Sequence, residues 1–205
     1  MLESLLSYID GPECDDVGVR IDRVAWNDSD LELTLAVTDY HGEVTLSEWL
    51  VRCRTVRECV ILGRFGDLVV HEFGHAAIRQ HRDPRRALFF TGSPRDVDAL
   101  IGQLWRAHQK IAGNWIAFDR YLNTERRLHD LLSFGFGKLA DGPDFLMQEY
   151  ARILTAASVD VSLGDLWPTK IWTEGKWVET AAELSMVAVD TSFVVAEGFD
   201  DERAG

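Results

Sequence analysis

Apolar residues that alternate with Glu32, Thr34 and Thr38 between positions 31 and 38 constrain the fold more than any other feature of the chain. These apolar residues are Leu31, Leu33, Leu35 and Val37. Successive side chains of a β-strand point to opposite faces of a sheet, so a period of two predicts a strand with one buried face. A second alternating run covers residues 17–21, and turn-forming residues separate the two runs. Together they predict a β-hairpin.

Further short apolar runs predict an antiparallel meander in the first part of the chain. They cover residues 49–53, 56–62 and 87–90, and polar or glycine-containing turns separate them. Residues 68–75 fall where the next strand of this meander would fall. Asp67 is equally suited to cap a helix that begins there. The pattern therefore leaves strand and helix open for this segment.

The middle of the chain carries the signals of helices. Ser93 is a suitable N-cap, Pro94 suits the first helical position, and apolar residues then recur at helical spacing until Gly113. Two further helices are predicted over residues 124–132 and 143–157.

Strands are predicted again in the last quarter of the chain. They cover residues 159–163, a hairpin over 172–177, and a pair formed by 184–189 and 193–197. The predicted fold class is α+β, with an N-terminal antiparallel β-meander, central helices and C-terminal β-hairpins. We expect a single domain over residues 1–205, mainly β in 1–92, mainly helical in 93–157, mainly β in 158–199, and with 200–205 as a frayed tail.

Composition limits the classes of partner. The formal net charge is −13 at pH 7, so repulsion argues against nucleic acid and anionic membranes as partners. No segment reaches the ~18 apolar residues of a membrane span, and the first eight residues lack the basic start of a signal peptide. A cytoplasmic protein of bacterial type is predicted, in which Cys14, Cys53 and Cys59 are reduced thiols.

His71-Glu72-Phe73-Gly74-His75 is the most specific motif of the chain. On a helix, residues i and i+4 lie on one face, so both imidazoles could bind one Zn²⁺ ion while Glu72 acts as general base on a metal-bound water. The motif resembles the active-site helix of the zincin metallopeptidases. This resemblance covers about ten residues and implies a zinc-dependent peptidase or hydrolase with Glu72 as its catalytic residue.

That mechanism requires a third protein ligand. His81 lies ten residues after His71, which is the metzincin spacing, but Ile78 stands where those enzymes have a glycine with a positive φ. Glu179 or Glu183 is the alternative ligand.

Local structure separates the two interpretations of the motif. A helix over residues 67–80 with converging histidines favours zinc. A strand over residues 68–74 would place His71 and Glu72 on opposite faces, which removes the mechanism.

Two other groups of residues are candidate binding surfaces. The first is a cluster of arginines in this acidic chain: Arg79, Arg82, Arg85, Arg86 and Arg95. Guanidinium groups suit carboxylate or phosphate, so the cluster is either an anion- or partner-binding face or a solvated loop paired with neighbouring acids. The second group is aromatic and lies within residues 105–121. Its members form either a pocket around Trp105 and His108 or a helix core in which His108 makes a hydrogen bond.

Phe134-Gly-Phe-Gly-Lys138 is rich in glycine but lacks the spacing of a phosphate-binding loop. It predicts instead a backbone turn wrapped by two buried phenylalanines.

The leading hypothesis is a cytoplasmic α+β binding protein, with no enzymatic activity established, whose partner is an unidentified protein or a small anionic ligand. Its candidate contact residues are Arg79, Arg82, Arg85, Arg86, Trp105 and His108. An acidic module of this kind would select a basic partner surface and lose binding at moderate salt. The alternative is a zinc metallohydrolase with Zn²⁺ held by His71, His75 and His81.

Overall fold

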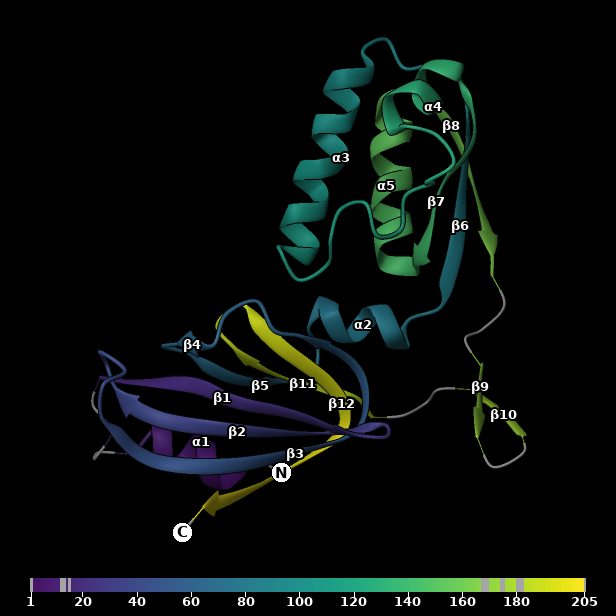
Figure 1. The fold of residues 1–205 in the computed structure, drawn as a ribbon. Coiled ribbons are helices and arrows are strands. Elements are labelled where there is room, and N and C mark those ends of the chain that lie inside the picture. The colour runs from purple at the N-terminus through teal and green to yellow at the C-terminus, as the bar shows by residue number, and fades with distance from the viewer. Residues whose placement is uncertain are drawn as a thin grey trace. The chain divides into compact units, whose positions relative to one another are not determined.

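The structure is a computed structural model that describes residues 2–11, 14, 16–166, 170–173, 176–179 and 183–204. It has the predicted α+β class, with a large antiparallel sheet and a smaller one (Figure 1). The chain divides into two compact units. Unit 1 comprises Met1–Ile78 and Ala182–Gly205, and unit 2 comprises Arg79–Ala181. Unit 2 is thus inserted into the sequence of unit 1.

Unit 1 is built on a seven-stranded antiparallel sheet. Its strands, in spatial order, are β4 (Phe65–Gly66), β1 (Val17–Asn27), β2 (Asp30–Asp39), β3 (Thr45–Val60), β12 (Ser192–Ala204), β11 (Ser185–Val189) and β5 (Val69–Glu72). The predicted hairpin of the alternating runs is confirmed as β1 and β2. The pairing of β11 with β12 is also confirmed. The two runs predicted as separate strands over 49–53 and 56–62 belong largely to the single long strand β3.

The alternating residues of unit 1 bury one face of this sheet. Helix α1 (Glu3–Ile9) packs on that face, and its Leu5 joins Leu35, Trp49 and Val51 in the core. Burial of these apolar side chains is the main stabilising contribution to such a sheet. Cys53 lies in the same core, and burial raises the pKa of its thiol to about 12. It therefore stays protonated at neutral pH.

The tail predicted to be frayed is instead part of the sheet. Strand β12 continues to Ala204, and its last residues pair with β3 from Arg52 to Glu48. The carboxylate of Asp201 also accepts a hydrogen bond from the backbone N–H of Leu5, in the first turn of α1. The tail prediction was wrong because these partners are more than 140 residues distant in the sequence and leave no local signal.

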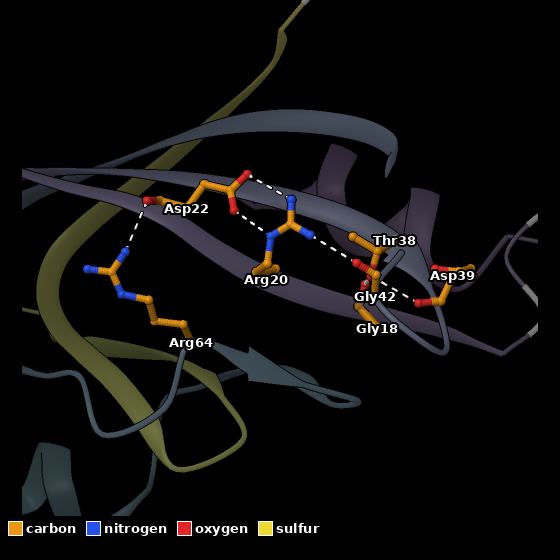
Figure 2. A network of polar contacts seen from close by, with 7 residues as sticks. All are labelled: Gly18, Arg20, Asp22, Thr38, Asp39, Gly42 and Arg64. Atoms are coloured by element: carbon orange, nitrogen blue, oxygen red, sulfur yellow. Dashed lines mark hydrogen bonds and ion pairs between the residues drawn. The ribbon is translucent and has the colours of Figure 1, made fainter. Parts of the chain in front are cut away.

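Polar side chains connect β1 with the β2–β3 turn, which contains Gly42, and with the segment before β4, where Arg64 donates to the carbonyl oxygen of Asp22 at 3.3 Å (Figure 2). Arg20 donates to Asp22 at 2.6 Å and to the carbonyl oxygen of Gly42 at 3.1 Å. Asp39 accepts hydrogen bonds from the backbone N–H groups of Glu43 and Val44. These donors hold the pKa of the Asp39 carboxyl below its usual value, because they favour the charged form.

Unit 2 contains a three-stranded antiparallel sheet. In spatial order its strands are β7 (Phe136–Pro143), β6 (Arg85–Thr91) and β8 (Asp160–Asp165), and its main helices are α3 (Val97–Ala112), α4 (Leu128–Phe134) and α5 (Asp144–Ala156). Both outer strands are antiparallel to β6, so β7, α5 and β8 form a split β-α-β unit around it. A hairpin of β9 (Lys170–Thr173) and β10 (Lys176–Glu179) confirms the strands predicted over 172–177. Helix α2 (Ala76–Arg82) spans the boundary between the units.

Helices α3 and α4 of unit 2 begin later than predicted, whereas α5 matches the helix predicted over residues 143–157. Helix α3 begins at Val97, and its N-cap is Asp96, whose carboxylate accepts from the N–H of Ala99 at 2.9 Å. Helix α4 begins at Leu128 rather than near residue 124. None of the helices in the described part of the chain is long and apolar enough to cross a membrane.

The glycine-rich segment also differs from its prediction. Residues from Phe136 onward form strand β7, where a turn was expected. Phe134 and Phe136 were predicted to be buried, but they are 52% and 57% exposed.

Candidate functional site

The most specific sequence motif lies mostly on a strand. Residues 69–72 form β5, which pairs with β11 so that His71 stands opposite Val187. Of the two alternatives left open for this segment, the strand is formed and a helix over residues 67–80 is not, since α2 begins only at Ala76. Two neighbouring β-branched residues, Val69 and Val70, and a partner strand far along the chain favour the strand.

This local structure differs from the active-site helix of a zincin. Adjacent strand residues point to opposite faces, so His71 and Glu72 do not share a face. His75 lies in the turn before α2, and its Nδ1 accepts from the backbone N–H of Ala77 at 3.2 Å. His81 lies on α2 in unit 2. Within the described residues, no three histidine, cysteine, aspartate or glutamate side chains are grouped to hold a metal ion.

His71 makes a contact that the motif does not predict. Its Nε2 lies 3.0 Å from the Oγ of Ser185, a buried residue on the neighbouring strand β11. Burial lowers the pKa of the imidazole, which favours its neutral form. Burial also lowers the pKa of His75, while the nearby Glu72 opposes that shift.

A pocket of about 300 Å³ opens beside His71. Two phenylalanine rings contact the imidazole, with centroid distances of 4.7 Å for Phe73 and 5.6 Å for Phe199. The pocket is lined by Arg54, His71, Phe73, Glu183, Leu184, Ser185, Glu197, Gly198, Phe199 and Asp200. All of these residues belong to unit 1. Aromatic faces thus lie next to carboxylates in one concave surface.

The charged residues of this pocket are mostly acidic. Glu183, Glu197 and Asp200 line it together with one cation, Arg54. Arg54 pairs with Asp200, and Arg57 pairs with Glu197. Glu183 was an alternative zinc ligand, and here it belongs to the pocket. The side chain of Glu179, the other alternative, lies outside the described residues.

The arginine cluster is largely paired with carboxylates in unit 2. Arg79 and Arg82 contact Asp83, Arg85 contacts Asp141, and Arg86 contacts Asp144 and Asp165. Arg95 is exposed before α3. These pairs match the second interpretation of the cluster, in which neighbouring acids satisfy the guanidinium groups.

Trp105 and His108 do not form one pocket. Trp105 is half exposed on α3, whereas His108 is fully buried. The Nε2 of His108 lies 2.6 Å from the carbonyl oxygen of Ile116, and its Nδ1 lies 2.8 Å from the Tyr150 hydroxyl. His108 is therefore a core histidine with both ring nitrogens hydrogen-bonded.

The pocket of unit 1 was missed by sequence reasoning. Its walls come from residues near 54, 71, 184 and 199, and only strand pairing brings them together. The one local signal was the motif that contains His71, which predicted a zinc site at the position where the structure has this pocket.

The fold and pocket define unit 1 as an open antiparallel sheet with a concave, acidic and aromatic site at its β5–β11–β12 end. No family model, curated protein or solved structure matches this chain.

Proposed function

We propose that unit 1 is a binding module that receives a positively charged group of a basic protein partner in the pocket beside His71. The observation that carries the proposal is the exposed Phe73 ring, which lines one pocket together with the Glu183 carboxylate. Phe199 is buried, and Glu197 and Asp200 already pair with Arg57 and Arg54, so Phe73 and Glu183 are the groups offered to a cation. An aromatic face attracts a guanidinium or ammonium group through its quadrupole, and a carboxylate adds a charge-assisted hydrogen bond. An arginine or lysine side chain combines both needs.

The charge of unit 1 supports a basic partner. Its residues include 7 arginines and no lysine against 21 aspartates and glutamates, which gives a formal charge of −14. Unit 2 has 14 cationic and 13 anionic residues, so its charge is only +1. Unit 1 therefore accounts for the net negative charge of the whole chain. Such a field steers basic partners and speeds their association.

The edge of the sheet adds a second contact for a protein partner. Strand β5 is the last strand of the sheet beside this pocket, and it is only four residues long. A terminal strand presents backbone N–H and C=O groups to which an extended peptide can add. A basic side chain on such a peptide would lie next to the pocket.

The test is an NMR titration of the full chain with small probes of one side chain. N-acetyl-arginine-methylamide is the probe, and the citrulline analogue is its neutral isostere. We expect the arginine probe to shift the amide signals of His71, Ser185 and Phe199, and the citrulline analogue to shift them several-fold less. Raising the salt concentration should reduce the shifts, since partly exposed charges are screened.

Two variants locate the binding. Glu183→Gln removes a carboxylate of the pocket, and Phe73→Leu removes an aromatic face, so both should weaken binding. Glu43→Gln is the matched control, because this exposed residue lies in the β2–β3 turn, about 30 Å along β3 from Arg54. Equal effects of Glu183→Gln and Glu43→Gln, or equal binding of the arginine and citrulline probes, would refute the proposal.

A further inference from the structure

A second hollow of unit 1 combines exposed rings with carboxylates. It has a volume of about 360 Å³ and is lined by Tyr40, Phe65, Gly66, Asp67, Leu68 and Asp190. Its aromatic and apolar side chains, Tyr40, Phe65 and Leu68, are all exposed. None of the six lining residues belongs to the pocket beside His71. Unit 1 therefore has two separate hollows in which rings lie beside carboxylates.

The Phe65 ring packs directly on the backbone of β1. A Cβ atom added at Gly18 would lie 2.3 Å from this ring, and one added at Gly42 would lie 3.3 Å from it. The close approach to β1 is thus one that the glycine at position 18 allows. A ring fixed in this way forms a rigid wall of the hollow, and a rigid wall loses little conformational entropy when a ligand binds.

The carboxylates of this hollow are not neutralised within the described part of the chain. Asp67 and Asp190 are exposed, and neither forms an ion pair with a described cation. Two arginines of this region are already engaged: Arg20 donates to the carboxylate of Asp22, and Arg64 donates to its backbone carbonyl oxygen (Figure 2). Two unbalanced negative charges thus lie beside aromatic rings, and this combination selects a positively charged ligand.

The two hollows lie at the two ends of β5. Leu68, in the second hollow, directly precedes this strand, and Phe73, in the pocket beside His71, directly follows it. The pairing with β11 extends to Leu68, whose carbonyl oxygen accepts from the backbone N–H of Asp190 at 3.0 Å. Leu68 and Phe73 are five positions apart, which corresponds to about 17 Å of extended chain.

The two hollows open on opposite faces of the sheet. Both neighbours of Gly18 in β1 pack on the core beneath α1, so Gly18 and the Phe65 ring on it lie on the other face. His71 stands opposite Val187, which belongs to that core, so the pocket beside His71 lies on the core face. In an extended peptide, side chains an odd number of positions apart point to opposite faces. Residues five positions apart satisfy both the distance and the change of face.

We propose that unit 1 binds an extended segment of a basic partner protein that carries two arginine or lysine residues five positions apart. The inference rests on the proposed function, because one of these residues occupies the pocket beside His71. The other enters the second hollow, where the Tyr40 and Phe65 rings and the carboxylates of Asp67 and Asp190 receive its charge. The segment adds to the outer edge of β5, the last strand of the sheet, and its backbone hydrogen bonds are the same for any sequence. The two charges and their spacing therefore determine which segment is selected.

The experiment is an NMR titration of the full chain with three short acetylated and amidated peptides. All have a background of serine and threonine; one carries a single arginine, and two carry a pair of arginines either five or four positions apart. We expect the five-apart peptide to bind about tenfold or more tightly than the single-arginine peptide, because the second contact becomes intramolecular. The four-apart peptide has the same charge but directs both arginines to one face, so it should bind little better than the single-arginine peptide. Equal affinities of the five-apart and four-apart peptides would overturn the proposal.

The position of the shifted signals separates this inference from the proposed function. The five-apart peptide should shift the amide signals of Tyr40, Leu68 and Asp190 as well as those of His71 and Ser185. Shifts confined to the pocket beside His71 would overturn the two-site inference and leave the proposed function in place. Absence of shifts in both hollows with every arginine-containing probe would refute both.

A matched pair of variants tests the second hollow. Asp190→Asn removes one of its charges, and asparagine tolerates the left-handed φ of 52° at this position, so the β11–β12 turn is retained. We expect this variant to bind the five-apart peptide several-fold less tightly and the single-arginine peptide as before. Asp28→Asn is the control, because Asp28 is also exposed, has φ of 55°, and lies in the β1–β2 turn about 30 Å along β1 from Gly18. Equal effects of the two variants on the five-apart peptide would contradict the proposal.

Discussion

Removal of the Tyr150 hydroxyl tests the buried hydrogen bonds of unit 2. A carbonyl oxygen can only accept, so His108 must donate from Nε2 to Ile116. Its Nδ1 is then an acceptor, and the Tyr150 hydroxyl donates to it at 2.8 Å. His108 is fully buried and Tyr150 is 1% exposed. In Tyr150→Phe the ring and its packing remain, while the Nδ1 of His108 loses its donor.

The structure sets the size of this effect. A buried acceptor left without a partner costs about 1–3 kcal/mol, because water cannot replace the lost donor. No cavity term of the kind that follows a Leu→Ala change is added, since only one oxygen atom is removed. We therefore expect Tyr150→Phe to destabilise unit 2 by about 1–3 kcal/mol.

Hydrogen exchange measures this loss within unit 2 itself. A cost of about 1–3 kcal/mol corresponds to exchange about 5- to 150-fold faster at the most protected amides of α3 and α5. Tyr40→Phe is the control, because Tyr40 is 56% exposed in unit 1 and its change should leave these amides unaffected. If Tyr150→Phe changed their exchange by less than twofold, the inferred tautomer and the buried bond would both be wrong.

Four further changes have defined expected outcomes. Gly135→Ala should lower the melting temperature, because it forces alanine into φ of 86° and places a Cβ 2.6 Å from Ser93 Oγ, at a cost of about 1–2 kcal/mol or more. Adding Ser93→Ala should restore only part of the lost stability, and full restoration would contradict the backbone argument. Asp39→Ala should lower the stability of unit 1 at neutral pH, and the difference in stability from the wild type should shrink in acid. The reason is that a carboxyl whose pKa is lowered by folding loses its stabilising effect as the pH falls through that pKa. A difference in stability that does not change between pH 6 and pH 2 would contradict this. In an NMR titration the His71 imidazole should have its midpoint below about 6.5, the usual value for histidine, because burial lowers its pKa. The contribution of this side chain to stability should fall as the pH drops below that value. A midpoint at or above 6.5 would be inconsistent with its burial. After incubation with one equivalent of Zn²⁺ and dialysis, mass spectrometry should find as little metal in the wild type as in a His71→Ala/His75→Ala variant. The reason is that strand β5 places His71 and Glu72 on opposite faces of the sheet. One zinc per chain in the wild type, lost in the variant, would restore the zincin interpretation.

The elements that were predicted well are those with a local cause. Alternation from Leu31 to Val37 reflects one buried face of β2, and the turn residues before it form the β1–β2 hairpin. The end of α3 at Gly113 follows from a helix pattern that stops at a glycine. These features depend on residues only a few positions apart, so the sequence displays them directly.

The elements that were missed or left open depend on distant partners. His71-Glu72-Phe73-Gly74-His75 has a period that fits helix or strand, and pairing with β11, more than 110 residues later, makes it a strand. Gly135 and Gly137 marked the segment of β7 as a turn, although each only adjusts the backbone at the start of a strand. The exposure of Phe134 and Phe136 was missed for the same reason, because both rings were assigned to a turn and expected to be buried.

The strand order of unit 1 has a consequence for how the chain folds during synthesis. Strand β12 lies between β3 and β11, so β3 keeps an open hydrogen-bonding edge until residues 192–204 have been made. All three strands of the main unit 2 sheet are present once residue 165 has emerged. Unit 2 can therefore fold while unit 1 is still half a sheet, and the exposed edge of β3 is the part of the nascent protein most open to mispairing.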